Sequence, residues 1–448
     1  NPVNIMAPRP MFQSSNAEIK EPPASADVFP RNIPKDATDI DVVDSMIAQQ
    51  MSNMTVQERE QAYLDVHGIS PLVEETPELI STKLEEMEKH IRSQHRREAY
   101  DVAESMSPQY VQDKDFRLMF LRADLFDAQK AALRLIRHFE VKRELFGVEK
   151  LTIDITQDDL DKEAMDCLYV GYAQFLRTPD RSNRIISLWI SCADHESYNV
   201  TSLLRREFYR NMHLLRTSEH AQKHGLVSLL YMLSRESSAP FPYDQAWELP
   251  KLTNALPTRM AAFHMVHNNK WLAPLLAFIK SSFSLVTRIR IRTHYGSHAE
   301  CMGSMQGHGV PPEILPLEEG GILTNKDAYR EYLREMRKEE RMKFPRRQHI
   351  FVPCSYDVLF GKGSSVQTFE GNKRMRRIVA DRQKSYEKAE KGKKVDVAQE
   401  VVDMVLESSG MFLKQADDGG EYWLSVDNES ARTKVSAAFR TLRIRTKG

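Results

Sequence analysis

The sequence predicts an α/β fold in which a mostly parallel sheet is covered by helices. Four short apolar runs, rich in β-branched residues, indicate buried strands at residues 184–192, 226–233, 259–267 and 287–293. The stretches between them indicate helices at about 204–224, 242–256 and 271–284. Because strands that alternate with helices usually pair in parallel, we expect these helices to pack over the sheet.

The composition divides the chain into five parts. The start is rich in Pro, Ser and Asn without periodicity, which is typical of disorder. Thr55 and Glu58 then form a capping pair that indicates a helix. After Pro345 we expect two helices, a hairpin turn at Asp417–Gly420 and a last helix from Asn428. The expected parts are a disordered tail, N-terminal helices, the α/β domain, a basic helical linker and a mainly helical C-terminal domain with a β-hairpin, at residues 1–38, 39–110, 111–322, 323–348 and 349–448.

Charge and cysteine content narrow the class of protein. Lys and Arg number 63, as do Asp and Glu, so the whole chain has no net field that attracts a polyanion. Between Arg330 and Lys394, however, there are nineteen Lys or Arg and only nine Asp or Glu. The four cysteines lack metal or disulfide spacing, which favours a reducing compartment, and no apolar run is long enough to span a bilayer. We expect a cytoplasmic protein and leave a nuclear location and targeting open, because the sequence does not begin with Met.

Four segments between about residues 78 and 322 follow one another in a recognisable order. They are FLRADLFDAQKAALRLIRHFEVKRELF, the turn Asp180–Arg184 with the following IISLWI, LPTRMAAFHMVHNNKWLAPLLAFIKSSFSLVTRIRIR, and HAECMGSMQGHGVPPEILPLEEGG. In this order they resemble the CRAL-TRIO domain, the fold of the α-tocopherol and phosphatidylinositol transfer proteins. The chain departs from the family at Asn183, where glycine is usual, at SRES (234–237) and at Asn268–Lys270.

The resemblance implies a protein that binds a hydrophobic lipid in a buried cavity and transfers it, and that is not an enzyme. It implies a transient, peripheral association with membranes and no cofactor besides the lipid, whose identity stays open. In the family the helix at 271–284 is a mobile gate, and its nearly all-round apolar surface fits either a gate or an ordinary buried helix. The expected cavity and gate residues are Trp189, Tyr231, Phe263, Met265, Leu272, Leu275, Leu276, Phe278, Ile279 and Phe283.

Three arginines follow the gate helix on an expected strand, namely Arg288, Arg290 and Arg292. A guanidinium binds phosphate well, so one of them is a candidate for a lipid head group. A solvated strand edge is the plainer interpretation.

The C-terminal part resembles a second family. The stretches DVLFGKGSSVQTFEGNKRMRRIV, AQEVVDMVLESSGMFLK and ARTKVSAAFRTLR, between Asp357 and Arg443, look like an uncharacterised domain common in diatom and other stramenopile proteins. Its helices carry a candidate basic contact surface, formed by Lys373, Arg374, Arg376, Arg377, Arg440 and Arg443. The alternative function is therefore a regulatory scaffold whose C-terminal domain binds nucleic acid or protein.

No metal site or catalytic motif is expected. His220 and His224 have metal-compatible spacing, but no third ligand lies nearby in the sequence. His264 and His267 fall on opposite faces of a strand. Gly361–Gly363 lacks the residue order of a phosphate-binding loop. A pocket around His264 is the only support for an enzyme, which ranks third after a lipid carrier and a scaffold.

Overall fold

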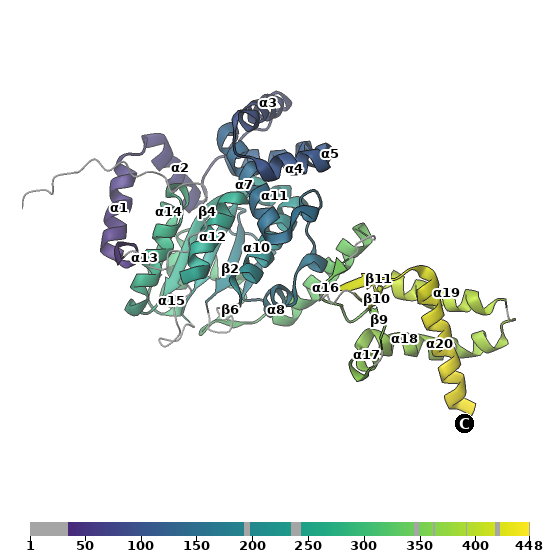
Figure 1. The fold of residues 1–448 in the computed structure, drawn as a ribbon. Coiled ribbons are helices and arrows are strands. Elements are labelled where there is room, and N and C mark those ends of the chain that lie inside the picture. Colours follow the sequence, from purple (N-terminus) through teal and green to yellow (C-terminus); the bar gives the residue numbers. More distant parts are fainter. Residues whose placement is uncertain are drawn as a thin grey trace, which may run out of the picture.

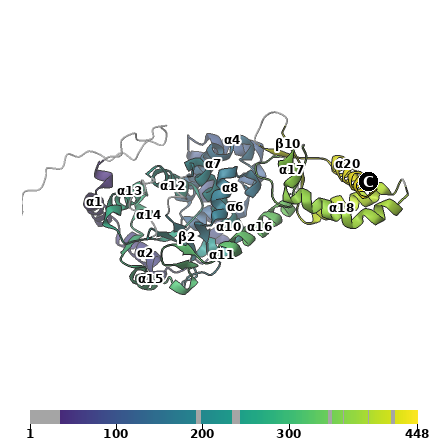
Figure 2. The same ribbon diagram turned by 90° about the horizontal axis from the view of Figure 1, so that it is seen from below.

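The computed structural model describes residues 35–191, 198–233, 243–344, 349–361, 363–390, 392–416 and 422–447. An α/β domain and a smaller C-terminal module lie end to end and give the molecule an elongated shape (Figures 1 and 2). Of the tail expected at residues 1–38, the described part is the short 3-10 helix η1 (Lys35–Thr38).

A five-stranded sheet in the order β1-β2-β3-β4-β5 forms the centre of the α/β domain. Strands β2 to β5 are parallel, and β1 pairs antiparallel with β2 at one edge. The strands are β1 (Ala173–Phe175), β2 (Ile185–Ile190), β3 (Leu226–Tyr231), β4 (Met260–His267) and β5 (Ile291–Tyr295). The prediction of a mostly parallel sheet with covering helices is confirmed.

Two features of the sheet differ from the prediction. β1 has only three residues and no β-branched one, so it left no strand signal in the sequence. The strand expected at 287–293 begins only at Ile291, because Leu285–Arg288 forms the helical turn α14. Arg288 donates hydrogen bonds to the carbonyls of Lys280, Ser281 and Phe283, and these tertiary bonds hold the turn against the strand preference of Val286 and Thr287.

Helices cover both faces of the sheet. We call the face under α12 and α13 the first face; it carries an apolar cluster and also contacts α10. The opposite, second face packs against Val66 of α2 and the inner side of α15. Within the described ranges, no helix is both long and apolar enough to cross a membrane. The bounds of these helices are α2 (Val56–His67), α10 (Val200–Thr217), α12 (Tyr243–Ala255), α13 (Ala273–Ser282) and α15 (His298–Gln306).

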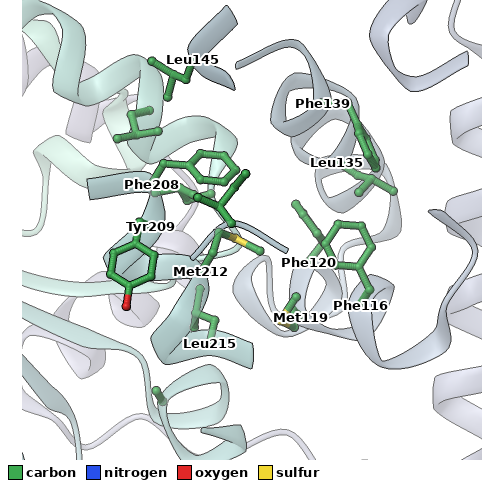
Figure 3. Close-up of a cluster of buried hydrophobic side chains, with 14 of the residues drawn as sticks. Phe116, Met119, Phe120, Leu135, Phe139, Leu145, Phe208, Tyr209, Met212 and Leu215 are labelled. Atoms are coloured by element: carbon green, nitrogen blue, oxygen red, sulfur yellow. The ribbon is translucent and has the colours of Figure 1, made fainter. Parts of the chain in front are cut away.

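A helical lobe packs on α10 through a core rich in aromatic residues. Phe116 of α6 and Phe139 of α7 contact one another edge to face, and Phe208 of α10 belongs to the same buried cluster (Figure 3). Such clusters are stabilised mainly by removing apolar surface from water. The lobe contains α3 (Pro77–Ser93), α4 (Glu98–Met106), α5 (Pro108–Val111), α6 (Lys114–Ala123) and α7 (Ala128–Phe146), and α8 (Lys162–Val170) leads on to β1.

The C-terminal module combines helices with a small sheet in the order β8-β11-β10-β9. The expected hairpin is the antiparallel pair of β10 (Phe412–Gln415) and β11 (Trp423–Ser425), and its turn lies outside the described residues. Two further short strands, β8 (His349–Ile350) and β9 (Val358–Leu359), widen it. The helices are α17 (Ser364–Thr368), α18 (Glu370–Lys388), α19 (Lys394–Glu407) and α20 (Asn428–Lys447).

The segment EGN at the start of α18 has a structural role. A Cβ atom on Gly371 would lie 1.8 Å from the carbonyl oxygen of Asp357, so only glycine fits there. The side chain of Asn372 accepts a hydrogen bond from the backbone N–H of Leu359 and donates one to its carbonyl. These contacts join α18 to β9 and give the EGN segment a structural role that needs no ligand.

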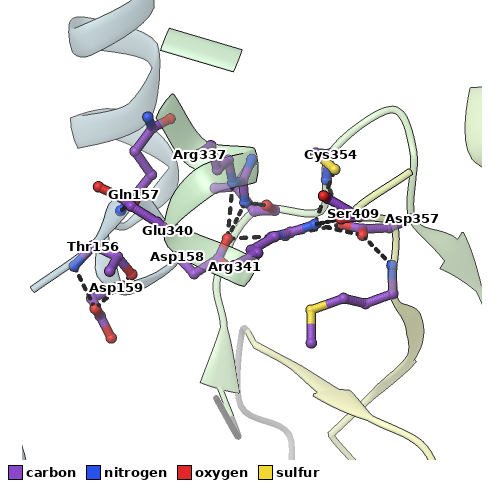
Figure 4. Close-up of polar contacts among 12 residues, drawn as sticks. Thr156, Gln157, Asp158, Asp159, Arg337, Glu340, Arg341, Cys354, Asp357 and Ser409 are labelled. Carbon is purple, nitrogen blue, oxygen red and sulfur yellow. Dashed lines mark hydrogen bonds and ion pairs between the residues drawn. The ribbon is translucent and has the colours of Figure 1, made fainter. Parts of the chain in front are cut away.

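Helix α16 (Lys326–Lys343) joins the two parts through a buried ionic network. The guanidinium groups of Arg337 and Arg341 both bind Asp158, with shortest distances of 2.6 and 2.8 Å, and Arg341 also binds Asp357 at 2.7 Å (Figure 4). All four side chains are at most 6% exposed. The segment 323–348, expected as a linker, therefore contains a helix that packs against both parts. Burial would raise the pKa of Asp158, but the charges of Arg337 and Arg341 outweigh it and lower this pKa.

Replacing Asp158 with Asn should destabilise the chain strongly. The substitution leaves two buried guanidinium groups with one carboxylate, Asp357, and breaking a buried ion pair costs about 3–5 kcal/mol. Urea unfolding of the full chain measures the loss. The control, Glu331→Gln, removes the exposed partner of Arg334 and should cost at most about 1 kcal/mol. Equal losses in the two variants would contradict the importance of the network.

Candidate functional site

An apolar cavity of about 130 Å³ lies between the first face of the sheet and helices α12 and α13. β2 contributes Trp189, β4 contributes Phe263, and α13 contributes Leu275 and Ile279. Because side chains alternate along a strand, Ser228 and Leu230 of β3 reach this face, whereas Leu229 between them packs on the other. The further lining residues are Ile190, Ser191, Ser228, Leu230, Met232, Gln245, Ala246, Leu249, Thr253, Met260 and Phe283.

The structure brings half of the expected cavity residues together at this cavity. Those that line it are Trp189, Phe263, Leu275, Ile279 and Phe283. Those that belong to the surrounding apolar cluster without lining the cavity are Met265, Leu272, Leu276 and Phe278.

Tyr231 does not lie at the apolar cavity, contrary to expectation. It is in β3 with the side-chain parity of Val227 and Leu229, which pack on the second face of the sheet. There its hydroxyl lies 3.0 Å from Nδ1 of His298 in α15. The alternating pattern of β3 defined two faces but did not indicate which of them meets α13.

A polar cavity of about 360 Å³ adjoins the apolar one, and the two share Thr253 and Met260 in their walls. It lies where β4 and β5 begin, between α2, the α6–α7 corner and α14. Its walls carry five cationic and three anionic side chains, which are Lys130, Arg134, Arg137, Arg259 and Arg290, and Glu58, Asp65 and Asp124. The polar cavity therefore has an excess of positive charge.

Two carboxylates form ion pairs with three of the five cations. Asp65 binds Arg259 and Arg290, at 2.5 and 2.6 Å, and Asp124 binds Arg134 at 2.7 Å. Burial would raise the pKa of Asp65, but the charges of the two arginines outweigh it and lower this pKa. Asp65 is therefore ionised over the physiological pH range.

The remaining cations of the polar cavity are accessible. Arg137 is exposed and forms no close ion pair within the described part of the chain, although its charge partly offsets the raised pKa of Glu140. Lys130 forms a surface pair with Asp127 at 3.1 Å. Hydrogen bonds from Thr55 lower the pKa of Glu58, so this wall residue stays anionic. The excess charge thus comes from α7.

The residues that sequence reasoning missed come mainly from two helices. Lys130, Arg134 and Arg137 occur at positions i, i+4 and i+7 of α7 and therefore share one face. This spacing was a readable signal, but it does not indicate that the face meets β4 and β5. Ala246 and Leu249 of α12 line the apolar cavity without any distinctive motif.

The three arginines after α13 have internal partners. Arg288 binds the last carbonyls of α13, and Arg290 binds Asp65 in the wall of the polar cavity. Arg292 donates to the carbonyls of Ile289 and Ile291, each at 2.9 Å. Only Arg290 therefore lies at a cavity.

His264 lies on the second face of the sheet, away from both cavities. Its Nδ1 is 2.9 Å from Nε2 of His294, and the ring of His308 is 5.0 Å from that of His264 between centroids. Burial is the main cause that lowers the pKa of His264 well below its ordinary value and that of His294 to about 4, and the charges of His308 and Arg292 contribute to both shifts. Among the described residues, no group of three or more His, Cys, Asp or Glu side chains is arranged to hold a metal ion.

The basic residues expected on the C-terminal module lie on two of its helices. Lys373 and Arg377 are within 3.6 Å of Glu370, Arg376 donates to the carbonyl of Gln367, and Arg374 lies over the ring of Tyr356. These four are on α18, and the exposed residues Arg440 and Arg443 are on α20. Burial lowers the pKa of Lys434 on α20, and the charge of Arg376 adds to this effect, so the two helices bring cations close together.

A further cavity, of about 300 Å³, lies at the junction of α16 with the C-terminal module. Its cationic wall residues are already paired, Arg337 and Arg341 with Asp158, Arg334 with Glu331, and Lys338 with Glu335. The charges of this cavity are therefore balanced and do not indicate a charged ligand.

Comparison with known proteins adds two findings. A family model described as a domain of unknown function, DUF6824, matches residues 357–441, which agrees with the extent expected for an uncharacterised domain. A solved structure titled "Crystal structure of Sfh5" is similar to the chain with a TM-score of 0.37 and 11% identity, over 60% of this chain and all of that one. At this TM-score the likeness adds no support to the fold described above. No curated protein matches the chain.

Acidification should destabilise the α/β domain through the histidine pair. His264 and His294 are uncharged in the fold and have lowered pKa values, so their contribution to stability is complete above about pH 6.5, the unfolded pKa. It decreases as the pH falls toward the folded value of about 4 for His294. For this buried pair, the loss should be roughly 1–3 kcal/mol. Urea unfolding between pH 7 and pH 4 measures it.

The variant His294→Gln should weaken this pH dependence. The control His95→Gln, at an exposed position of the helical lobe, should leave it unchanged. If His294→Gln unfolds with the same pH dependence as the natural chain, the histidine pair is not its source.

Proposed function

We propose that this chain binds an amphiphilic lipid in the two adjoining cavities and carries or presents it between membranes, without catalysing a reaction. The observation that carries the proposal is the shared wall at Thr253 and Met260, which joins an apolar cavity to a cationic one. A lipid has the same two parts, an apolar chain and a polar head. The CRAL-TRIO resemblance of the sequence implies the same class of ligand.

The apolar part would supply most of the affinity. Each CH₂ group removed from water contributes about 0.8 kcal/mol. The cavity of about 130 Å³ is smaller than the roughly 300–1,000 Å³ typical of ligand sites, so a lipid chain enters only if the walls move apart. The mobile wall in this proposal is α13, the expected gate, because Leu275 and Ile279 form one side of the cavity.

The cationic part would bind the head group. Arg137 is exposed at the mouth and forms no close ion pair in the described chain, so its guanidinium is free to bind a phosphate. Arg290 and Arg259 contribute less, since Asp65 already binds them. The preferred ligand is therefore a lipid with an anionic head group.

The C-terminal module would act as an interaction module. The neighbouring cations Arg376 and Lys434 favour an anionic partner and keep the nucleic-acid alternative in view. A chain that never takes up lipid, but binds duplex DNA in a salt-dependent manner, would replace the carrier with the scaffold function.

Filling the apolar cavity should abolish lipid uptake. Ala246→Phe places an aromatic ring in a cavity of about 130 Å³ and leaves too little room for a chain. Native mass spectrometry after incubation with mixed phospholipid vesicles measures occupancy, which should fall at least about tenfold. The control Ala299→Phe, at an exposed position of α15, should bind normally. Full occupancy in a folded Ala246→Phe variant would place the lipid elsewhere.

Neutralising the cationic wall should change lipid selection more than total uptake. In the double variant Lys130→Gln, Arg137→Gln, the apolar cavity is intact but the two accessible cations of α7 are lost. In the same assay, competition between phosphatidylinositol and phosphatidylcholine should shift about five- to twentyfold toward the zwitterionic phosphatidylcholine. The control Lys89→Gln, Arg96→Gln removes the same charge from an exposed part of the lobe. An unchanged ratio would exclude this wall as the head-group site.

A further inference from the structure

The outer side of α13 is covered by a segment from the start of the described chain. This N-terminal cover, residues 35–52, comprises η1 and α1 (Ile40–Ser52), and both lie against α13 (Figure 1). Ala37 and Ile40 pack on the apolar cluster of α13. The expected gate helix is thus enclosed between the apolar cavity on its inner side and the cover on its outer side.

Polar contacts join the cover to α13 and α14. Asp44 binds the ammonium group of Lys280 at 2.7 Å, and Gln50 accepts a hydrogen bond from Arg288 at 2.8 Å. The hydroxyl of Ser281 donates to the carbonyl of Ala37. The cover therefore occupies the two cations that this side of α13 and α14 presents.

The cover and the face beneath it carry opposite charges. Residues 35–52 contain four carboxylates, Asp36, Asp39, Asp41 and Asp44, and one cation, Lys35. The face beneath combines Lys280 and Arg288 with apolar side chains, and Val286 of the neighbouring α14 is 57% exposed. A cationic and apolar face is the type of surface that binds an anionic bilayer, whereas an acidic segment is repelled by one.

The cover is weakly held. Val43 is the one buried residue of α1, and Asp44 is 50% exposed in its ion pair. A helix of 13 residues is marginally stable in water by itself, so α1 depends on its contact with α13. A competing surface can therefore displace it.

We propose that the N-terminal cover blocks a membrane-docking face on α13 and α14 and is displaced by an anionic phospholipid bilayer. Lipid phosphates would replace Asp44 and Gln50 as partners of Lys280 and Arg288, and acyl chains would replace Ile40. This inference rests on the proposed function, because displacing the cover frees the outer side of α13, the helix that would close the apolar cavity over a lipid. It makes the carrier open at a membrane and stay closed in solution.

Weakening the cover should strengthen docking. The full-length double variant Ile40→Ser, Val43→Ser weakens the apolar packing of α1, which includes the contact of Ile40 with the cluster of α13, without a change of charge. It should bind vesicles of equal parts phosphatidylcholine and phosphatidylserine about tenfold more tightly than the natural chain in co-sedimentation. The control Val42→Ser, Val56→Ser makes equivalent changes at exposed positions and should bind like the natural chain.

A second pair of variants isolates the ionic contact. Asp44→Asn removes the partner of Lys280 and should raise vesicle binding about two- to fivefold. Asp41→Asn makes the same change of charge on an exposed residue of the same helix and should have a smaller effect. Equal effects of the two would mean that net charge alone is responsible, and would overturn the inference.

Lipid occupancy of the same samples, measured by native mass spectrometry, separates this inference from the proposed function. Unchanged vesicle binding in both cover variants, in chains that do take up lipid, would overturn the cover and leave the carrier. Increased vesicle binding in chains that never take up lipid would support the docking face and overturn the carrier. Increased binding to pure phosphatidylcholine vesicles to the same degree would overturn the requirement for an anionic surface.

Discussion

The architecture around the cavities depends on one buried carboxylate. Asp65, near the end of α2, binds Arg259 and Arg290, the residues that immediately precede β4 and β5. Without it, two guanidinium groups would be buried at the sheet edge with no opposite charge. The same ion cluster fixes α2 under the sheet, forms a wall of the polar cavity and anchors the chain from which the N-terminal cover extends.

The position of the polar cavity is unusual for an open parallel sheet. Ligands of such sheets generally bind outside the carboxyl ends of the strands. Here the polar cavity lies at the amino ends of β4 and β5, where Met260 and Arg290 are in its wall. The helical lobe makes this placement workable, because α7 brings Lys130 and Arg137 to an edge that the sheet itself would leave without free cations.

Local patterns in the sequence predicted strands β2 to β4, part of β5, the C-terminal hairpin and most helices, and half of the residues expected at the cavity line it. Trp189 and Leu275 were accessible to this reasoning because apolar alternation and helical spacing are local properties. Other features depend on residues far apart in the chain. They are the packing of the β3 face that carries Tyr231, the contact of α7 with the sheet edge, and the ion pair of Arg341 with Asp158. Such contacts depend on tertiary packing, which sequence periodicity does not encode. They determine where the polar cavity lies, and they make α16 a packed helix and not only a linker.

The bond between Arg341 and Asp357 has a consequence for the way the C-terminal module is inherited. Asp357 is the first residue of the DUF6824 match, yet its buried carboxylate is neutralised by a side chain that lies before that match. A protein that carries the module without a helix like α16 must supply another cation at this position or replace the aspartate. In this chain the module therefore uses Arg341 of α16, which lies outside the matched range 357–441.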